Sequence, residues 1–308
     1  MKATVLSGGV GGARFLRGLV SVVEEDNVAI IGNVGDDVEV LGLHVSPDLD
    51  SILYALTGLA DEERGWGRAG ETWNALATVA DLGGDSWFRL GDRDLGLHLV
   101  RTELLGTGTP LSTATRRLAA ALGLRAALLP ATDDPLRTFV TTPAGTFPFQ
   151  EWFVGRGHRD EVDAVHYAGA GSAGAAPGVV DAIERAELIV IAPSNPYVSI
   201  GPILAVEEIR EALERRRVPC IAVSPLIGGS AVKGPADRML ARLAGGTGPA
   251  EVAGCYPGLI DALVIDERDA SAALPGNVRV VVAHTLMSDA EARRRLAHAV
   301  VDAGAAVA

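Results

Sequence analysis

The chain has 308 residues, of which 48% are hydrophobic and 21% are charged, and its formal net charge is −12 at neutral pH. This length and composition allow a sizeable buried core and argue against a disordered chain. The acidic balance argues against a general nucleic-acid or anionic-membrane binder, because both need a basic face. A small phosphorylated ligand is compatible with it, since a local site can be basic or bridged by a metal ion.

The cysteines and the N-terminal residues predict a cytoplasmic protein. Two cysteines, Cys220 and Cys255, form neither a disulfide framework nor a Cys-x-x-Cys metal motif. Residues 1–19 are interrupted by glycines and by Arg14 and Arg17, so they lack the apolar region of a signal peptide. No apolar run reaches about 18 residues, and we therefore expect no membrane span.

Short apolar, β-branched runs alternate with helical patterns along the chain. The runs that predict buried parallel strands are residues 3–6, 28–31, 188–192, 220–223, 262–265 and 278–283. Helical spacing predicts helices over residues 11–23, 203–216 and 290–301. Strands that alternate with helices indicate an α/β protein with a Rossmann-like, doubly wound and mostly parallel sheet.

Three segments do not follow this alternation of strand and helix patterns. Residues 48–122 contain four helical patterns and little strand signal, and we interpret them as a helical insertion within a single α/β domain over residues 1–308. Residues 133–166 are rich in Thr, Pro and aromatic residues, which predicts a small β excursion. The Gly/Ala-rich stretch 167–180 is compatible with either a mobile loop or a linker.

A glycine-rich turn, Ser-Gly-Gly-Val-Gly-Gly at residues 7–12, lies between the first strand and the first helix. Glycines let the backbone approach an anion, and the helix start offers free N–H groups and the positive end of the dipole. The motif is neither a Walker A nor a GxGxxG, but its strand–turn–helix context favours phosphate binding over an ordinary tight turn. The residues of this predicted phosphate site are Gly8, Gly9, Val10, Gly11 and Gly12.

Two further loops follow predicted strands, at residues 192–196 and 224–237. Open parallel sheets bind ligands outside the carboxyl ends of their strands, so the three loops are expected to meet in one crevice. Ser194 and Asn195 offer hydrogen bonds to a base or a phosphate, and Lys233 offers a point charge. Ordinary turn chemistry explains each loop alone, whereas their convergence favours a nucleotide-like ligand.

Carboxylates cluster just after the second predicted strand. Asp36 and Asp37 follow that strand directly, and Asp48 and Asp50 lie at the start of the next helix, where an acid also serves as a cap. Carboxylates near a phosphate loop suggest Mg²⁺, which takes one or two carboxylates together with phosphate oxygens. A solvated acidic loop with a helix cap is the alternative at this point.

Two polar segments in the predicted helical insertion are ambiguous on the sequence alone. Residues 89–105 contain Gly-Asp-Arg-Asp leading into a helix, which favours a capped helix with an internal ion pair. Trp66 and Trp73 flank glycines in a polar context, where they either stack on a planar heterocycle or pack in the core.

The order of the motifs resembles one known family. The segments that carry the resemblance are SGGVGGARF, NVGDD, SPDLDSILYAL, ETWNA, LGDRD, LPATDDP, FQEWFV, APSNPYVSIGPIL and SPLIGG, and the similarity extends from the N-terminus to about Glu267, nearly the whole chain. In this order they resemble the 2-phospho-L-lactate transferase family of coenzyme F-420 biosynthesis. The sequences GGVGGARF and RGWG with ETWNA are most similar to the actinobacterial branch, for which the resemblance implies phosphoenolpyruvate transferase activity.

The resemblance implies a reaction between two small molecules. The ribityl hydroxyl of the deazaflavin Fo would attack the phosphorus that bears the enolpyruvyl or lactyl group of a guanosine-diphosphate-activated three-carbon acid, and GMP would leave. The sequence does not decide between the two acids. The resemblance also implies Mg²⁺ dependence and a homodimer.

The resemblance places roles on particular residues of this sequence. It implies that Asp50 and Arg89 bind the deazaflavin; family members often carry Lys at the second position, and Arg keeps the charge with a different geometry. Asp50 would orient or deprotonate the hydroxyl, and Asp36, with Asp37, would hold Mg²⁺. The remaining deazaflavin residues are Trp66, Trp73 and Asn74, and the remaining nucleotide residues are Ser194, Asn195, Ser224, Pro225 and Gly228.

Two other functions are the alternatives to this one. A non-catalytic regulator on the same fold would bind a sugar nucleotide and need no deazaflavin pocket, and the LGDRD and ETWNA segments argue against it. A nicotinamide-dependent oxidoreductase predicts GxGxxG with an acid about 20 residues further on, and the glycine pattern differs. No covalent nucleophile is needed for the transferase, since such chemistry depends on positioning and charge neutralisation.

Overall fold

A seven-stranded parallel sheet forms the centre of the computed structural model, which describes residues 1–307. The strand order is β14-β13-β10-β9-β1-β2-β5, and every neighbouring pair is parallel. The strands are β1 (Ala3–Ser7), β2 (Val28–Gly32), β5 (Ala127–Pro130), β9 (Leu188–Ile191), β10 (Cys220–Val223), β13 (Ala262–Asp266) and β14 (Arg279–Ala283). The predicted doubly wound α/β fold is confirmed, and each predicted strand agrees with an observed one to within a residue.

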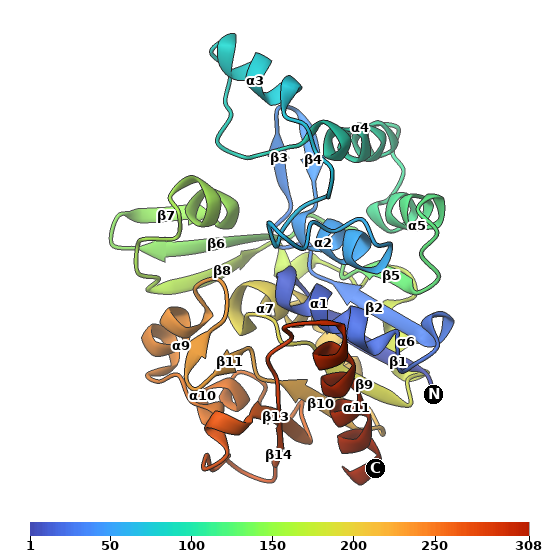
Figure 1. Ribbon diagram of the computed structural model, residues 1–308, viewed down its shortest axis with the longest axis vertical. Helices are drawn as coiled ribbons and strands as arrows, with labels where there is room; N and C mark the ends of the chain where they lie inside the picture. The colour runs from blue at the N-terminus through green and yellow to red at the C-terminus, as the bar shows by residue number, and fades with distance from the viewer. Residues whose placement is uncertain (308) are drawn as a thin grey trace.

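The chain order of these strands reverses between β1 and β9. From β1 the chain moves outward through β2 to β5, then returns to the other side of β1 and continues through β9, β10, β13 and β14 (Figure 1). Ala3 pairs with Val28 on one side and with Leu188 on the other. Such a topological switch point leaves a crevice at the carboxyl ends of the two central strands, where ligands of this fold class bind.

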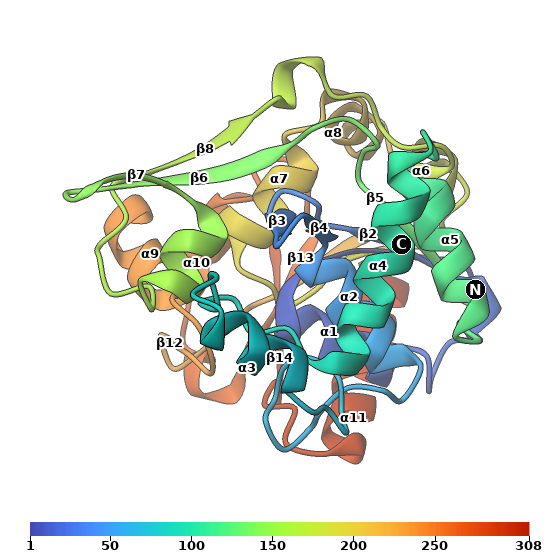
Figure 2. The ribbon, with the colours of Figure 1, turned by 90° about the horizontal axis from the view of Figure 1, so that it is seen from above.

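Helices cover both faces of the sheet (Figure 2). On one face α1 (Gly9–Leu19) packs against both α2 (Pro47–Leu56) and α11 (Ala290–Val307). The opposite face carries α6 (Val179–Glu184) and α8 (Glu207–Glu214), which pack together. Because the central strands are covered on both sides, their residues are almost all apolar and buried, as in β9 and β10.

The segment predicted as a helical insertion contains four helices, and a short hairpin lies just before it. After α2 come α3 (Asn74–Asp81), α4 (Asp92–Gly106) and α5 (Leu111–Ala121). The hairpin, β3 (Val38–Val40) and β4 (Leu43–Val45), was not predicted, because three-residue strands carry little alternation. Helix α3 has no buried residue and projects at one end of the long axis (Figure 1).

A second small sheet lies within and just beyond the segment predicted as a β excursion. Its strands are β6 (Arg137–Thr142), β7 (Gly145–Pro148) and β8 (Ala164–Ala168), in the order β7-β6-β8. A π-helical turn (Glu151–Gly155) follows β7 and buries Trp152 against Val140 and Phe149. The Gly/Ala-rich stretch after β8 contains a short 3₁₀ turn (Ala170–Ser172) and leads into α6.

The predicted helix over residues 203–216 is wrong as a single element. The chain forms a π-helical turn η4 (Pro196–Ile200), then α7 (Gly201–Leu204), and only then α8. Val206 has an extended backbone conformation (φ −75°, ψ 112°), which interrupts the helical hydrogen bonds, and Arg210 Nε donates to the freed carbonyl of Leu204 at 3.2 Å. Apolar residues keep helical spacing across this break, so the pattern alone does not show it.

The remaining elements lie in the C-terminal half of the chain, apart from one short turn before β2. They are β11 (Leu226–Ile227), β12 (Ser230–Ala231), α9 (Ala236–Ala244), α10 (Pro249–Gly254) and the short 3₁₀ turns at Glu25–Asn27 and Glu267–Asp269. Within residues 1–307, no helix combines the length and the apolar character that crossing a membrane requires.

Candidate functional site

A cavity of about 510 Å³ opens at the carboxyl ends of β1, β9 and β10. Its wall includes the glycine turn after β1, residues 193–195 after β9 and residues 224–225 after β10. The rest of the wall comes from α1, α2 and α4, from the loops that follow β2 and precede α4 and α9, from the π-helical turn after β7 and from the segment after β14. The three strand-end loops therefore converge at the switch point, as the sequence predicted.

Close packing explains why the turn after β1 is built from glycine. Gly8 precedes the first residue of α1 with extended backbone angles, and a Cβ there would collide with the Asp48 carboxylate and with Ser199. A Cβ on Gly11 would lie 2.5 Å from the Pro193 carbonyl oxygen. The absence of side chains lets the loops from β1 and β9 touch and leaves backbone N–H groups of α1 facing the cavity.

Most of the predicted nucleotide residues line this cavity. The lining members are Gly8, Gly9, Val10, Gly11, Ser194, Asn195, Ser224 and Pro225. Gly12 does not line it, because it packs beneath the turn, where a Cβ would lie 2.7 Å from Ser194 Oγ. Gly228 does not line it either: it lies in the β11–β12 turn, and its N–H donates to Asp269 at 2.9 Å.

The polar side chains of these loops hold the loops in shape. Ser194 Oγ donates to the Gly8 carbonyl at 2.7 Å, which ties the β9 loop to the glycine turn. Asn195 Oδ1 accepts from the Tyr197 N–H at 2.9 Å and caps η4. Ser224 Oγ accepts from the Leu226 N–H at 3.2 Å. Hydrogen bonds to a ligand in this part of the cavity therefore fall mainly to the backbone.

Two buried carboxylates, Asp36 and Asp48, face the cavity together. Asn33 Nδ2 lies between them, at 3.5 Å from Asp36 Oδ1 and 2.9 Å from Asp48 Oδ2, and Gln150 Nε2 donates to Asp36 Oδ2 at 3.0 Å. Burial raises the pKa of Asp48 to about 6, against the opposing hydrogen bonds from Asn33 and Gly9. Burial and the charges of Asp48 and Asp37 raise the pKa of Asp36 well above its ordinary value.

Asp37 is placed differently from its neighbour. It does not line the cavity; its Oδ2 lies 2.8 Å from His44 Nε2 and accepts from Ser46 Oγ at 3.0 Å. The structure therefore brings Asp48 to Asp36 and leaves Asp37 behind them, because the β3–β4 hairpin places His44 beside Asp37. Among residues 1–307, no three or more His, Cys, Asp or Glu side chains gather as a metal-ligand group.

Asp50 lines the cavity from the first turn of α2 and is paired with α4. Arg101, which is 1% exposed, donates through Nη1 to Asp50 Oδ2 at 3.0 Å and through Nη2 to Asp50 Oδ1. His98 Nδ1 lies 3.8 Å from Asp50 Oδ2, and His98 Nε2 lies 3.3 Å from Asp94 Oδ1. The Tyr54 hydroxyl donates a hydrogen bond to Asp94 Oδ1.

Two members of the site, Arg101 and His98, were not predicted from the sequence. The pattern over residues 89–105 favours a helix with an internal ion pair, whereas Arg101 pairs with Asp50 on another helix. The available signal was the spacing of Asp94, His98 and Arg101, which places all three on one face of α4. That spacing does not reveal a partner 51 residues away.

The predicted deazaflavin residues separate into two groups. Trp66 and Arg89 line the cavity, whereas Trp73 and Asn74 do not. The Arg89 guanidinium lies 4.8 Å above the Trp73 ring, and the centroids of Trp73 and Trp66 are 6.4 Å apart. Asn74 begins the exposed helix α3, and its Nδ2 donates to Asp92 at 3.0 Å. Trp73 therefore does not line the cavity but packs against two residues that do, Arg89 and Trp66.

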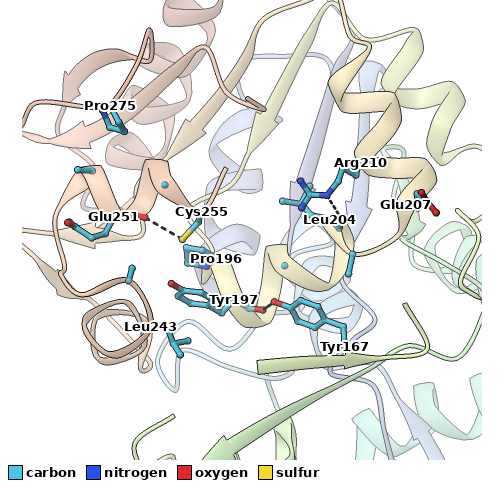
Figure 3. A pocket seen from close by; sticks show the side chains of 15 residues that line it. Tyr167, Pro196, Tyr197, Leu204, Glu207, Arg210, Leu243, Glu251, Cys255 and Pro275 are labelled. Carbon is cyan, nitrogen blue, oxygen red and sulfur yellow. Dashed lines mark hydrogen bonds between the residues drawn. The ribbon is translucent and has the colours of Figure 1, made fainter. Parts of the chain in front are cut away.

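A second cavity, of about 880 Å³, lies on the other side of η4 (Figure 3). Tyr167, Tyr197 and Cys255 line it, and the Tyr167 hydroxyl donates to the Tyr197 carbonyl at 2.5 Å. None of the predicted site residues lines it. The chemistry that the sequence predicts therefore belongs to the smaller cavity at the switch point.

Fold and site together define a doubly wound α/β protein with its ligand site at the topological switch point. The family model described as 2-phospho-L-lactate transferase CofD matches residues 3–305. A phosphoenolpyruvate transferase of Streptomyces griseus is 42% identical over 306 residues, which cover 96% of each chain. A 2-phospho-L-lactate transferase of Methanosarcina mazei is 34% identical over 302 residues, which cover 97% of this chain and 99% of the other. The chain therefore belongs to the CofD family of 2-phospho-L-lactate transferases and is an enzyme of the transferase class.

A solved structure supports the fold independently. A member of the UPF0052 family from Bacillus halodurans has a TM-score of 0.63 with 16% sequence identity, and the match covers 97% of this chain and 98% of that one. At this identity the comparison shows the shared α/β fold and nothing about ligands.

Proposed function

We propose that the protein transfers a phosphoenolpyruvyl group from a guanosine-diphosphate-activated donor to the ribityl hydroxyl of the deazaflavin Fo and releases GMP, as a step of coenzyme F-420 biosynthesis. The Streptomyces griseus relative, at 42% identity, carries the name phosphoenolpyruvate transferase, which supports this three-carbon group over phospholactate. We also expect a cytoplasmic homodimer.

One observation carries the proposal: a single cavity contains the glycine turn, the Asp36–Asp48 pair and Asp50. The turn offers backbone N–H groups suited to a diphosphate, and the acidic pair lies against the same turn, since Asp48 nearly contacts Gly8. Asp50 lies two residues from Asp48, on the first turn of α2. Phosphate-binding groups and a hydrogen-bond acceptor for an attacking hydroxyl are therefore adjacent.

The Asp36–Asp48 pair fits a divalent cation. Burial raises the pKa of both carboxylates, and the charges of Asp48 and Asp37 add to the effect on Asp36, so the charged forms are costly without a cation. Oxygen ligands of this type suit Mg²⁺, which takes one or two carboxylates and leaves its other positions to phosphate and water. Mg²⁺ bound there would neutralise charge on the diphosphate of the donor. Asp36 and Asp48, in place of the predicted Asp36 and Asp37, are the residues that would hold it.

Asp50 is suited to orient the attacking hydroxyl. Arg101 holds the carboxylate through two hydrogen bonds, which fixes its direction. We therefore assign Asp50 the role of accepting a hydrogen bond from the ribityl hydroxyl and orienting it. In the reaction a bond forms between the ribityl oxygen and the donor phosphorus, the bond from that phosphorus to GMP breaks, and the hydroxyl proton passes to water.

The deazaflavin ring has a matching wall near Asp50. Phe88, Arg89 and Trp66 line one part of the cavity, and Phe149 and Phe153 line another. Aromatic faces and a guanidinium are suited to a planar conjugated ring. This wall supports the proposal over a regulator that binds only a sugar nucleotide.

Fluorescence titration with Fo tests the proposal. We expect saturable binding near micromolar concentration, and Asp50→Asn should abolish turnover while guanine-nucleotide affinity changes little. Absence of Fo binding in protein that still binds GDP would favour the regulator. Equal loss of turnover and of GDP binding in Asp50→Asn would refute the role given to this residue. Light scattering of the purified protein tests the expected homodimer.

A further inference from the structure

Two basic side chains lie together in the cavity, and neither forms a salt bridge within the described residues. Arg14 extends from the second turn of α1, Lys233 from the loop between β12 and α9, and both line the cavity. Lys233 Nζ donates to the Gly65 carbonyl at 2.8 Å. A Cβ added to Gly65 would lie 3.3 Å from Lys233 Nζ and 3.5 Å from Arg14 Nη2, so the two nitrogens are at most about 7 Å apart.

The surroundings of this pair are unusual for basic residues in an acidic protein. Within residues 1–307 neither Arg14 nor Lys233 forms a salt bridge, whereas Arg17, three residues along α1, pairs with Glu62. Burial and the neighbouring Arg14 charge lower the pKa of Lys233, so the two cations repel. An arrangement that costs energy in the free protein and faces a cavity is typical of a binding site for an anion.

The proposed donor carries three anionic groups, which are two phosphates and one carboxylate, and the two phosphates already have binding groups in the cavity. The glycine turn and a cation on Asp36 and Asp48 address the diphosphate, whereas the carboxylate of the three-carbon acid has no counterpart among them. Arg89, the other arginine of the cavity wall, lies over the Trp73 ring in the proposed deazaflavin part of the cavity. Arg14 and Lys233 are therefore the basic groups left for the carboxylate.

We propose that Arg14 and Lys233 form a subsite that binds the carboxylate of the three-carbon acid, a proposal that rests on the proposed function. A guanidinium matches a planar carboxylate with two parallel hydrogen bonds, and an ammonium adds a point charge. Binding at this end would anchor the acid and direct the attached phosphorus toward Asp50. The subsite would select donors with a free carboxylate over sugar nucleotides that lack one.

Binding of two guanine ligands separates this subsite from the diphosphate site. The ligands are the enolpyruvyl donor and GDP, which lacks the acid, titrated by calorimetry into wild-type protein, Arg14→Met and Lys233→Met. Arg14→Met should weaken donor binding about tenfold or more, because this is the change in affinity that the loss of a charged hydrogen bond produces. The same substitution should change GDP binding by less than about twofold. Lys233→Met should act in the same direction to a smaller extent, because an ammonium offers a point charge and not the two parallel hydrogen bonds of a guanidinium.

Two controls keep the test independent of folding. Arg17→Met removes an arginine from the same helix outside the cavity and should leave both affinities unchanged. A donor whose carboxylate is a methyl ester should bind wild-type protein about tenfold more weakly than the free acid.

Several outcomes would overturn the subsite. Equal weakening of donor and GDP in Arg14→Met would assign the pair to the diphosphate instead. Full affinity of the methyl ester, or identical behaviour of Arg14→Met and Arg17→Met, would refute a carboxylate contact. An Arg14-dependent preference for the donor over GDP without product formation from Fo would support the subsite and refute the proposed transfer.

Discussion

Arg101→Met is expected to lower both the stability and the turnover of the protein. Arg101 is 1% exposed and pairs with Asp50, which is 4% exposed, so the substitution leaves a buried carboxylate without its counter-ion. Methionine keeps much of the apolar stem and therefore isolates the effect of the charge.

The expected loss follows from the geometry of this pair. Removing one partner of a buried ion pair costs about 3–5 kcal/mol, because the remaining charge stays desolvated. His98 Nδ1 lies 3.8 Å from Asp50 Oδ2, so the carboxylate keeps one polar neighbour after the substitution. We therefore expect a loss of about 3 kcal/mol in the free energy of unfolding.

Chemical denaturation followed by circular dichroism measures this loss, and Arg93→Met is the matched control because Arg93 is exposed on the same helix. The double variant with Asp50→Asn should regain part of the stability, since the unpaired charge is gone, and should remain inactive. That combination separates the structural role of the pair from its role in turnover. An Arg101→Met protein within about 0.5 kcal/mol of the control, or a double variant no more stable than the single one, would refute the reasoning.

Three further predictions concern the metal, the ring and pH. Asp36→Asn and Asp48→Asn should each raise the Mg²⁺ concentration for half-maximal turnover about tenfold or more, measured by Mg²⁺ titration of product formation, and an unchanged response in both would move the metal elsewhere. Trp66→Ala should raise KM for Fo by about 5–50-fold with little change in the affinity for GDP, and equal changes in both would remove Trp66 from the ring site. Hydrogen bonds from Thr285 and Arg268 hold the pKa of Asp266 below 3.8 despite burial, so this group stabilises the fold above that pH and the contribution is lost as pH falls through its folded pKa. Asp266→Asn should therefore be less stable than wild type at pH 7, and the difference should shrink below about pH 4; a difference independent of pH would contradict this.

The strand pattern and the first loop were predictable because they depend on local residues. Buried parallel strands such as β10 are continuous apolar runs. Glycines between a strand and a helix, as after β1, favour a turn whose backbone N–H groups bind an anion. The parallel arrangement of the strands was then enough to predict that three strand ends meet at one crevice, because this prediction needs no side-chain contacts.

The parts that were not predictable depend on contacts between distant segments. Asp37 leaves the cavity because the short β3–β4 hairpin brings His44 to it, and three-residue strands carry too little pattern to reveal this. Arg101 reaches Asp50 across 51 residues, and Lys233 reaches the Gly65 carbonyl, which lies beside Arg14, across 168 residues. Composition and periodicity describe single elements and contain no information about such pairings.

The mass of the product formed from Fo tests the central claim most directly. Purified protein, Fo and Mg²⁺ are incubated with the guanosine-diphosphate-activated enolpyruvyl donor, and the products are resolved by liquid chromatography and mass spectrometry. The proposed function predicts equal amounts of GMP and of Fo carrying a phosphoenolpyruvyl group on its ribityl chain. Unmodified Fo beside protein that binds guanine nucleotide would contradict it.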